Sequence, residues 1–257
     1  MTQSERRYHL IRALADERGV AIPLPAEADE QRRLLRALLN LRPPLPADAA
    51  FLRVQDAYLR EETRRRGITD VEWLSPVRPG IYLWQGDITT LHCDAIVNAA
   101  NSALLGCFCP NHGCIDNAIH TYAGIELRLA CADIMQAQGH DEPIGRAKIT
   151  PAFNLPSRYI LHTVGPHVVG RLTAEHRRAL ESCYRSCLAL AQEHGLRHIA
   201  FPCISTGEFH FPGKEAAQIA VRTVERYRAE NENPPEVIFN VWKEQDLFLY
   251  RRLLGCD

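Results

Sequence analysis

Three residues in one turn-rich stretch have the types and the spacing of a metal site. Cys107, His112 and Cys114 form a Cys-x4-His-x-Cys set, and thiolate and imidazole are ligands that zinc prefers. Three protein ligands leave a fourth coordination position open to water or substrate, as in catalytic zinc sites, whereas four ligands close a structural site. Cys109 lies in the same stretch and would close it. The spacing predicts an open zinc site; a closed site with Cys109, or reduced cysteines without a metal, are the alternatives.

A second loop has the composition of an anion site. It spans residues 202–213, between a predicted strand and a predicted helix, and contains Ser205-Thr206-Gly207. Small residues at such a junction let backbone N–H groups and the positive end of the following helix face a phosphate. The loop suits a diphosphate, and an ordinary strand-to-helix turn is the alternative. The sequence lacks the glycine motifs of dinucleotide dehydrogenases and of P-loop proteins, so neither class is indicated.

Composition excludes some partners. The 257 residues are 46% hydrophobic and 24% charged, which is typical of a soluble globular protein. A formal net charge of -1 indicates neither a nucleic acid nor an anionic membrane surface as partner. Nine cysteines without a leader-like or membrane-spanning apolar segment predict a reducing, cytoplasmic setting.

The chain divides into two parts by pattern. Residues 1–75 read as short amphipathic helices joined by proline-rich turns, and no motif there carries recognisable chemistry. The run Arg64-Arg65-Arg66 follows Glu61 and Glu62 by one turn, which favours a solvated helix end over a nucleic-acid site. From residue 76 onward, short apolar strands alternate with helices, and one helical stretch is expected from Asp116 to about Gly139.

This alternation predicts an α/β fold with a largely parallel or mixed sheet and helices on both faces. In such sheets the ligand crevice lies beyond the carboxyl ends of the strands. Both loops described above follow predicted strands. Asp116, at the start of a helix, is a candidate N-cap.

These segments together resemble a known family. Gly86-Asp87-Ile88-Thr89, the run from Asp94 to Asn101, the run from Ile115 to His120 with Ala123-Gly124, and the Ser205-Thr206-Gly207 loop occur in the order of the macrodomain. The resemblance covers the chain from about Val77 to its end. It implies a three-layer α/β/α fold with a mixed central sheet that binds ADP-ribose.

The cysteine-rich stretch from Gly106 to Cys114 stands where most catalytic macrodomains have a glycine-rich loop. In this it is similar to the zinc-containing macrodomains of microbial origin, which resemble ADP-ribosylhydrolases with an N-terminal helical extension. The resemblance therefore implies an extension over residues 1–75, a macrodomain over residues 76–257, and one Zn²⁺ per chain held by Cys107, His112 and Cys114 beside the distal ribose.

The resemblance also implies a role for each remaining site residue. At the adenosine end, Asp87 accepts a hydrogen bond from the adenine amino group, and the Ile88 backbone holds the adenosine. Phe239 and Asn240 lie near the adenine, and a place in the core is the alternative for Phe239. The diphosphate loop contributes the backbone of Ser205, Thr206 and Gly207, followed by Glu208 and by Phe209 against the distal ribose. Asn101 hydrogen-bonds that ribose, and Asp116 orients substrate or water, caps its helix, or does both.

The implied reaction is hydrolysis at the anomeric carbon of the distal ribose. Breaking that bond builds positive charge on the sugar and negative charge on the leaving group, and zinc would either activate water or act as a positioning Lewis acid. We expect a zinc-dependent hydrolase that removes mono-ADP-ribose from modified proteins; the alternative is an ADP-ribose reader with a structural zinc. The resemblance suggests a macro-type sirtuin and a lipoylated glycine-cleavage H-like protein as partners.

Overall fold

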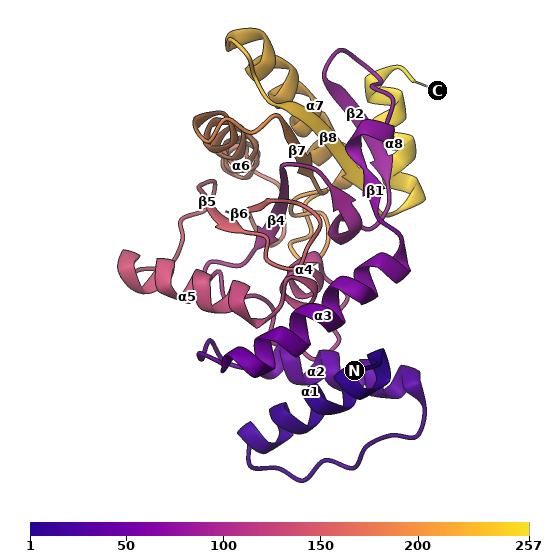
Figure 1. The fold of residues 1–257 in the computed structure, drawn as a ribbon. Coiled ribbons are helices and arrows are strands. Elements are labelled where there is room, and N and C mark those ends of the chain that lie inside the picture. Colours follow the sequence, from indigo (N-terminus) through magenta and orange to yellow (C-terminus); the bar gives the residue numbers. More distant parts are fainter. Residues whose placement is uncertain (257) are drawn as a thin grey trace.

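The N-terminal region is a bundle of helices. In the computed structural model, which describes residues 1–256, these are α1 (Gln3–Glu17), α2 (Ala28–Leu41) and α3 (Ala49–Arg66). Their apolar faces share one core, which also receives Ile125 from the rest of the chain. Asp48 caps α3 by accepting a hydrogen bond from the Phe51 amide at 2.7 Å, as expected of an aspartate before a helix. Figure 1 shows the bundle at one end of the molecule, next to α4.

The rest of the chain is built on a six-stranded mixed sheet in the order β2-β8-β7-β4-β6-β5. Only β5 runs antiparallel to its neighbour, and the other pairs are parallel. The predicted mixed sheet is confirmed. The strands are β2 (Ile81–Gln85), β4 (Ala95–Ala100), β5 (Ala147–Pro151), β6 (Tyr159–Val164), β7 (His198–Phe201) and β8 (Glu236–Val241). A short parallel pair, β1 (Thr69–Asp70) with β3 (Leu91–His92), lies outside this sheet.

Helices cover both faces of the sheet, because successive strand residues point to opposite sides. Ile96 and Ile238 belong to the core under α4 (Ile115–Ala123) and α5 (Ile125–Gln138). Val97 and Phe239 belong to the opposite core, under α6 (Ala174–Glu193), α7 (Gly213–Glu230) and α8 (Glu244–Leu254). The result is the predicted three-layer arrangement (Figure 1). No helix within residues 1–256 combines the length and apolarity that a membrane span needs.

The prediction of a single helix from Asp116 to about Gly139 is wrong. Two helices occupy this stretch, separated by Gly124 at φ 100°, a conformation that non-glycine residues rarely adopt. A Cβ at Gly124 would also meet the Gln55 side chain of α3 at 2.8 Å. Gln55 accepts a hydrogen bond from the Ile125 amide at 2.9 Å, so the break is where the N-terminal bundle docks.

Candidate functional site

A cavity of about 770 Å³ lies at the carboxyl ends of the parallel strands. It is bordered by the segments that follow β2, β4, β6, β7 and β8, as expected for ligand sites of parallel sheets. All the predicted site residues except Phe239 line it. These are Asp87, Ile88, Asn101, Cys107, His112, Cys114, Asp116, Ser205, Thr206, Gly207, Glu208, Phe209 and Asn240.

Phe239 does not line the cavity, so its predicted place at the ligand site is wrong. Its side chain is fully buried and packs against Tyr250, with ring centroids 5.0 Å apart. The strand continues to Val241, so its alternation turns Phe239 into the core. Trp242, just beyond the strand, is 71% exposed and lines the cavity. The sequence analysis missed Trp242. The available signal was an aromatic residue directly after the end of a predicted strand.

The three predicted metal ligands come together. One potential donor atom from each of Cys107, His112 and Cys114 lies within 4.8 Å of the other two. Cys107 Sγ and His112 Nδ1 are 3.6 Å apart, and tetrahedral zinc with ordinary Zn–S and Zn–N bonds places such atoms about 3.6 Å apart. Cys109 is exposed and outside this group. The donor set therefore fits zinc with an open fourth position.

Burial also affects the ionisation of these ligands. Burial, with Cys107 as a nearby thiol, raises the pKa of Cys114 to about 12. Without a metal this thiol is therefore protonated at neutral pH, and metal binding would release its proton. On the far side of the His112 ring, Nε2 lies 3.7 Å from the Glu208 carboxylate. This carboxylate comes from the predicted diphosphate loop, so the two loops meet across the cavity.

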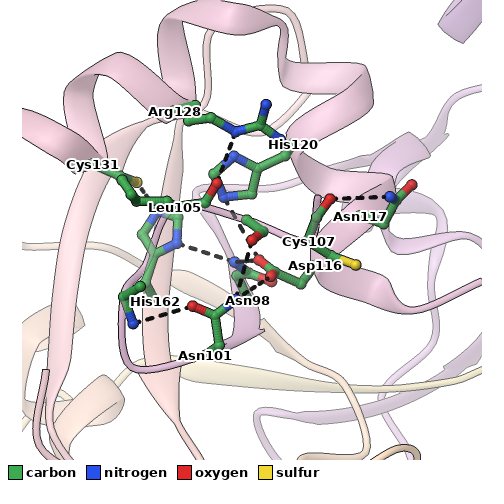
Figure 2. Close-up of polar contacts among 12 residues, drawn as sticks. Asn98, Asn101, Leu105, Cys107, Asp116, Asn117, His120, Arg128, Cys131 and His162 are labelled. Atoms are coloured by element: carbon green, nitrogen blue, oxygen red, sulfur yellow. Dashed lines mark hydrogen bonds and ion pairs between the residues drawn. The ribbon is translucent and has the colours of Figure 1, made fainter. Parts of the chain in front are cut away.

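Asp116 lies at the centre of a buried polar network (Figure 2). Asn98 donates to its Oδ1 at 2.8 Å, and Asn101 donates to its Oδ2 at 3.3 Å. His120 Nε2 lies 3.6 Å from Oδ1. Burial raises the pKa of Asp116 to about 6. The two amides hold this carboxylate as a hydrogen-bond acceptor at the cavity wall.

One sequence expectation changes here. Asp116 is not the N-cap of α4, because Cys114 holds that position and its sulfur accepts from the Asn117 amide at 3.4 Å. The Asn101 amide nitrogen already donates to Gly106 and to Asp116. The carbonyl oxygen of Asn101 accepts from the Ala103 amide and has a second lone pair, which is the side of this group left for a ligand.

Behind Asp116 lies a second group of buried side chains, His120, Cys131 and His162. His162 contacts the Asn98 amide nitrogen through Nδ1 at 3.2 Å and Thr150 Oγ1 through Nε2 at 2.9 Å. Burial lowers the pKa of His162 to about 3, so the ring is neutral, accepting through Nδ1 and donating through Nε2. His162 thus helps to orient Asn98, which donates a hydrogen bond to Asp116.

The predicted adenine end is held by the N-terminal bundle. The Asp87 carboxylate accepts from the Thr89 amide at 3.0 Å and the Thr89 hydroxyl at 2.6 Å. Arg66 of α3 donates to its other oxygen at 2.6 Å. The neighbouring arginines do pair with Glu61 at the helix surface, as predicted. For Arg66 the interpretation as a solvated helix end is wrong.

The predicted diphosphate loop lines the opposite side of the cavity. Ser205 adopts a left-handed conformation at φ 64°, and Phe211 donates back to the Ser205 carbonyl at 2.9 Å, which closes the turn. The amides of Gly207, Glu208 and Phe209 donate to no acceptor within residues 1–256. Consecutive backbone N–H groups without protein acceptors suit an anionic ligand.

Known proteins are similar to this chain in sequence and in fold. The Macro domain family model matches residues 97–220. The chain is 53% identical to a protein-ADP-ribose hydrolase of Treponema medium over 99% of this chain and 100% of the relative. It is 48% identical to a protein-ADP-ribose hydrolase of Staphylococcus aureus over 98% of this chain and 96% of the relative. A Trypanosoma brucei macrodomain in complex with ADP-ribose is 30% identical, with a TM-score of 0.67, 85% of this chain covered and 95% of that one. On this evidence, the chain belongs to the macrodomain family.

Proposed function

We propose that this protein is a zinc-dependent hydrolase that removes mono-ADP-ribose from modified proteins. The observation that carries the proposal is one cavity that contains both a three-ligand metal group and the buried Asp116 carboxylate, next to a loop with unpaired backbone amides. The relatives named protein-ADP-ribose hydrolase match nearly the whole chain, which supports the same activity.

We propose one orientation for ADP-ribose in the cavity. The adenine amino group would donate to Asp87, and Asn240 and Trp242 border the same end. The diphosphate would accept hydrogen bonds from the amides of the loop at Gly207. The distal ribose then lies beside Asn101, Asp116 and the metal ligands, with Phe209 against the sugar. This places the anomeric carbon at the end of the cavity where the chemical groups gather.

Each group at the distal-ribose end of the cavity has a proposed role in the reaction. Asn98 and Asn101 fix the Asp116 carboxylate, which then orients the ribose or a water through the hydrogen bonds it accepts. Asn101 contributes its carbonyl oxygen to the ribose. When bound by Cys107, His112 and Cys114, zinc supplies a Lewis acid that stabilises charge on the leaving group or the attacking oxygen.

The remaining parts of the proposal rest on the resemblance. We assign residues 1–75 to a helical extension and residues 76–257 to the macrodomain. The apolar core of the bundle, in which Ile125 is the one buried residue from beyond residue 75, supports this division. The cysteines of the described chain are all free thiols, which suits the proposed reducing, cytoplasmic setting. A macro-type sirtuin and a lipoylated H-like carrier are the proposed partners. Cleavage is proposed at the anomeric carbon.

Turnover with and without metal tests the proposal. Mono-ADP-ribosylated protein is incubated with the zinc-loaded protein, with the protein after chelation, and with the chelated protein resupplied with zinc, and released ADP-ribose is measured. We expect release only in the first and third samples. Binding of ADP-ribose without release in any of them would favour the alternative, a reader whose zinc is structural.

A further inference from the structure

Helix α2 of the N-terminal bundle contacts the metal loop, here defined as residues 107–114. The guanidinium of Arg36 lies at the cavity wall. Its Nη2 donates to the His112 carbonyl oxygen at 3.0 Å. Its Nε and Nη2 both donate to the side-chain oxygen of Asn117, at 3.1 and 2.7 Å. One side chain from outside the sheet region therefore bonds directly to a metal-ligand residue.

Asn117 connects Arg36 to two further residues of the metal loop. Its side chain is fully buried, and its amide nitrogen donates to the carbonyls of Cys107 and Cys109 at 3.3 and 3.0 Å. A primary amide has one accepting and one donating side. Because Arg36 is only a donor, it requires the Asn117 oxygen to face α2, and the nitrogen then faces the loop carbonyls.

A second α2 residue holds the middle of the metal loop. The buried side chain of Asn40 accepts from the Asn111 amide at 2.9 Å and donates to the Thr121 hydroxyl at 2.9 Å. Asn111 has φ 57°, a left-handed conformation that asparagine adopts more readily than most residues other than glycine. The loop is thus tied to α2 or to Asn117 at four points, Cys107, Cys109, Asn111 and His112.

We propose that Arg36 is a positioning residue for the metal loop, so that α2 is one wall of the metal site. The zinc part of this inference rests on the proposed function. Without Arg36 the buried Asn117 side-chain oxygen loses both of its hydrogen bonds, and only the carbonyls of Cys107 and Cys109 hold the amide in place. The carbonyl of His112 also loses its donor. Loss of a group that orients a metal ligand lowers metal affinity by roughly 10- to 100-fold.

The first measurement is zinc affinity by competition with a chromogenic chelator. Arg36→Ala should bind zinc at least about tenfold more weakly than the unmodified chain. Arg36→Lys should recover only part of the affinity, because an ammonium group lacks the guanidinium fork. Arg33→Ala removes an exposed arginine from the same helix and should change nothing. Equal zinc affinity in Arg36→Ala and Arg33→Ala, both folded, overturns the proposal.

The second measurement separates action through Asn117 from general destabilisation. If Arg36 acts through Asn117, Arg36→Ala should weaken zinc binding much less in an Asn117→Ala background than in the unmodified chain. If the two substitutions have fully additive effects on the free energy of zinc binding, the inference that Arg36 acts through Asn117 is overturned. The thermal midpoint of each variant reports whether its fold is intact.

A third measurement does not depend on zinc. In the metal-free protein, amide hydrogen exchange of residues 107–114 should be faster in Arg36→Ala than in Arg33→Ala, with unchanged exchange in the sheet. Unchanged exchange of the metal loop overturns the inference even if zinc binds. If the unmodified chain binds no zinc, the proposed metal function fails, while this exchange result still decides whether Arg36 positions the loop.

Discussion

Arg66 of α3 donates a hydrogen bond to Asp87 of the segment after β2 at 2.6 Å, and its guanidinium lies 3.6 Å from the centroid of the Tyr122 ring. Asp87 and Tyr122 both line the cavity. The N-terminal bundle thus reaches the proposed adenine end through α3 as well as the metal loop through α2. A region whose sequence shows no chemical motif contributes to both ends of one ligand site.

Asp87→Ala should weaken ADP-ribose binding by about 1 to 3 kcal/mol, because the adenine amino group loses its acceptor. Isothermal titration calorimetry measures this loss. Asp133→Ala, which removes an exposed carboxylate from α5, is the matched control and should bind normally. Unchanged affinity in a folded Asp87→Ala variant would show that the adenine lies elsewhere.

Arg66→Ala should weaken ADP-ribose binding by about 0.5 to 1.5 kcal/mol, the range for one hydrogen bond. The reason is indirect: Arg66 and Thr89 together hold the Asp87 carboxylate in one orientation. Arg65→Ala is the control, since Arg65 pairs with Glu61 at the surface. Tighter binding in Arg66→Ala would mean that Arg66 competes with the adenine for the carboxylate, contrary to this account.

Cys107→Ala, His112→Ala and Cys114→Ala should each lose zinc and hydrolysis together, because two remaining donors hold the ion poorly. Cys109→Ala should keep both, since Cys109 is exposed and outside the donor group. Elemental analysis and an ADP-ribose release assay on all four variants provide the test. Zinc loss in Cys109→Ala, or full turnover by a metal-free variant, would contradict an open catalytic site.

Acid should destabilise the fold through His162. Burial lowers its pKa to about 3 in the folded chain, against about 6.5 when unfolded. Below about pH 6.5 the unfolded state therefore binds a proton that the folded state does not, and stability falls as pH falls. At pH 5.5 this one ring lowers the free energy of unfolding by about 1.4 kcal/mol relative to its value well above pH 6.5.

Urea unfolding of the metal-free protein at pH 7.5 and 5.5 measures that loss. His162→Gln is less stable at both values, but its decrease between them should be smaller than that of the unmodified chain by about 1.4 kcal/mol. His9→Gln, at an exposed position of α1, should keep the full decrease. An identical decrease in His162→Gln would mean that this ring is protonated in the folded state.

The sequence by itself determined the local features of this protein. The spacing of Cys107, His112 and Cys114 is short enough for one loop to bring the ligands together, so the donor group was predictable without a fold. The alternation of strands and helices predicted the mixed sheet, and parallel strands place their following loops at one edge. Asp87, Asn101 and the loop at Gly207 were therefore predictable as neighbours.

Only the tertiary structure decided the features that depend on distant contacts or on which way a side chain points. Both faces of a central parallel strand are buried, so the apolar run around Phe239 has no pattern that separates core from cavity. Arg36 and Arg66 lie on amphipathic helices, where an arginine that faces water looks the same as one that meets a partner 81 or 21 residues away. Asp116 looked like a helix cap because its partner Asn98 lies on a strand 18 residues earlier. Packing alone selects these partners.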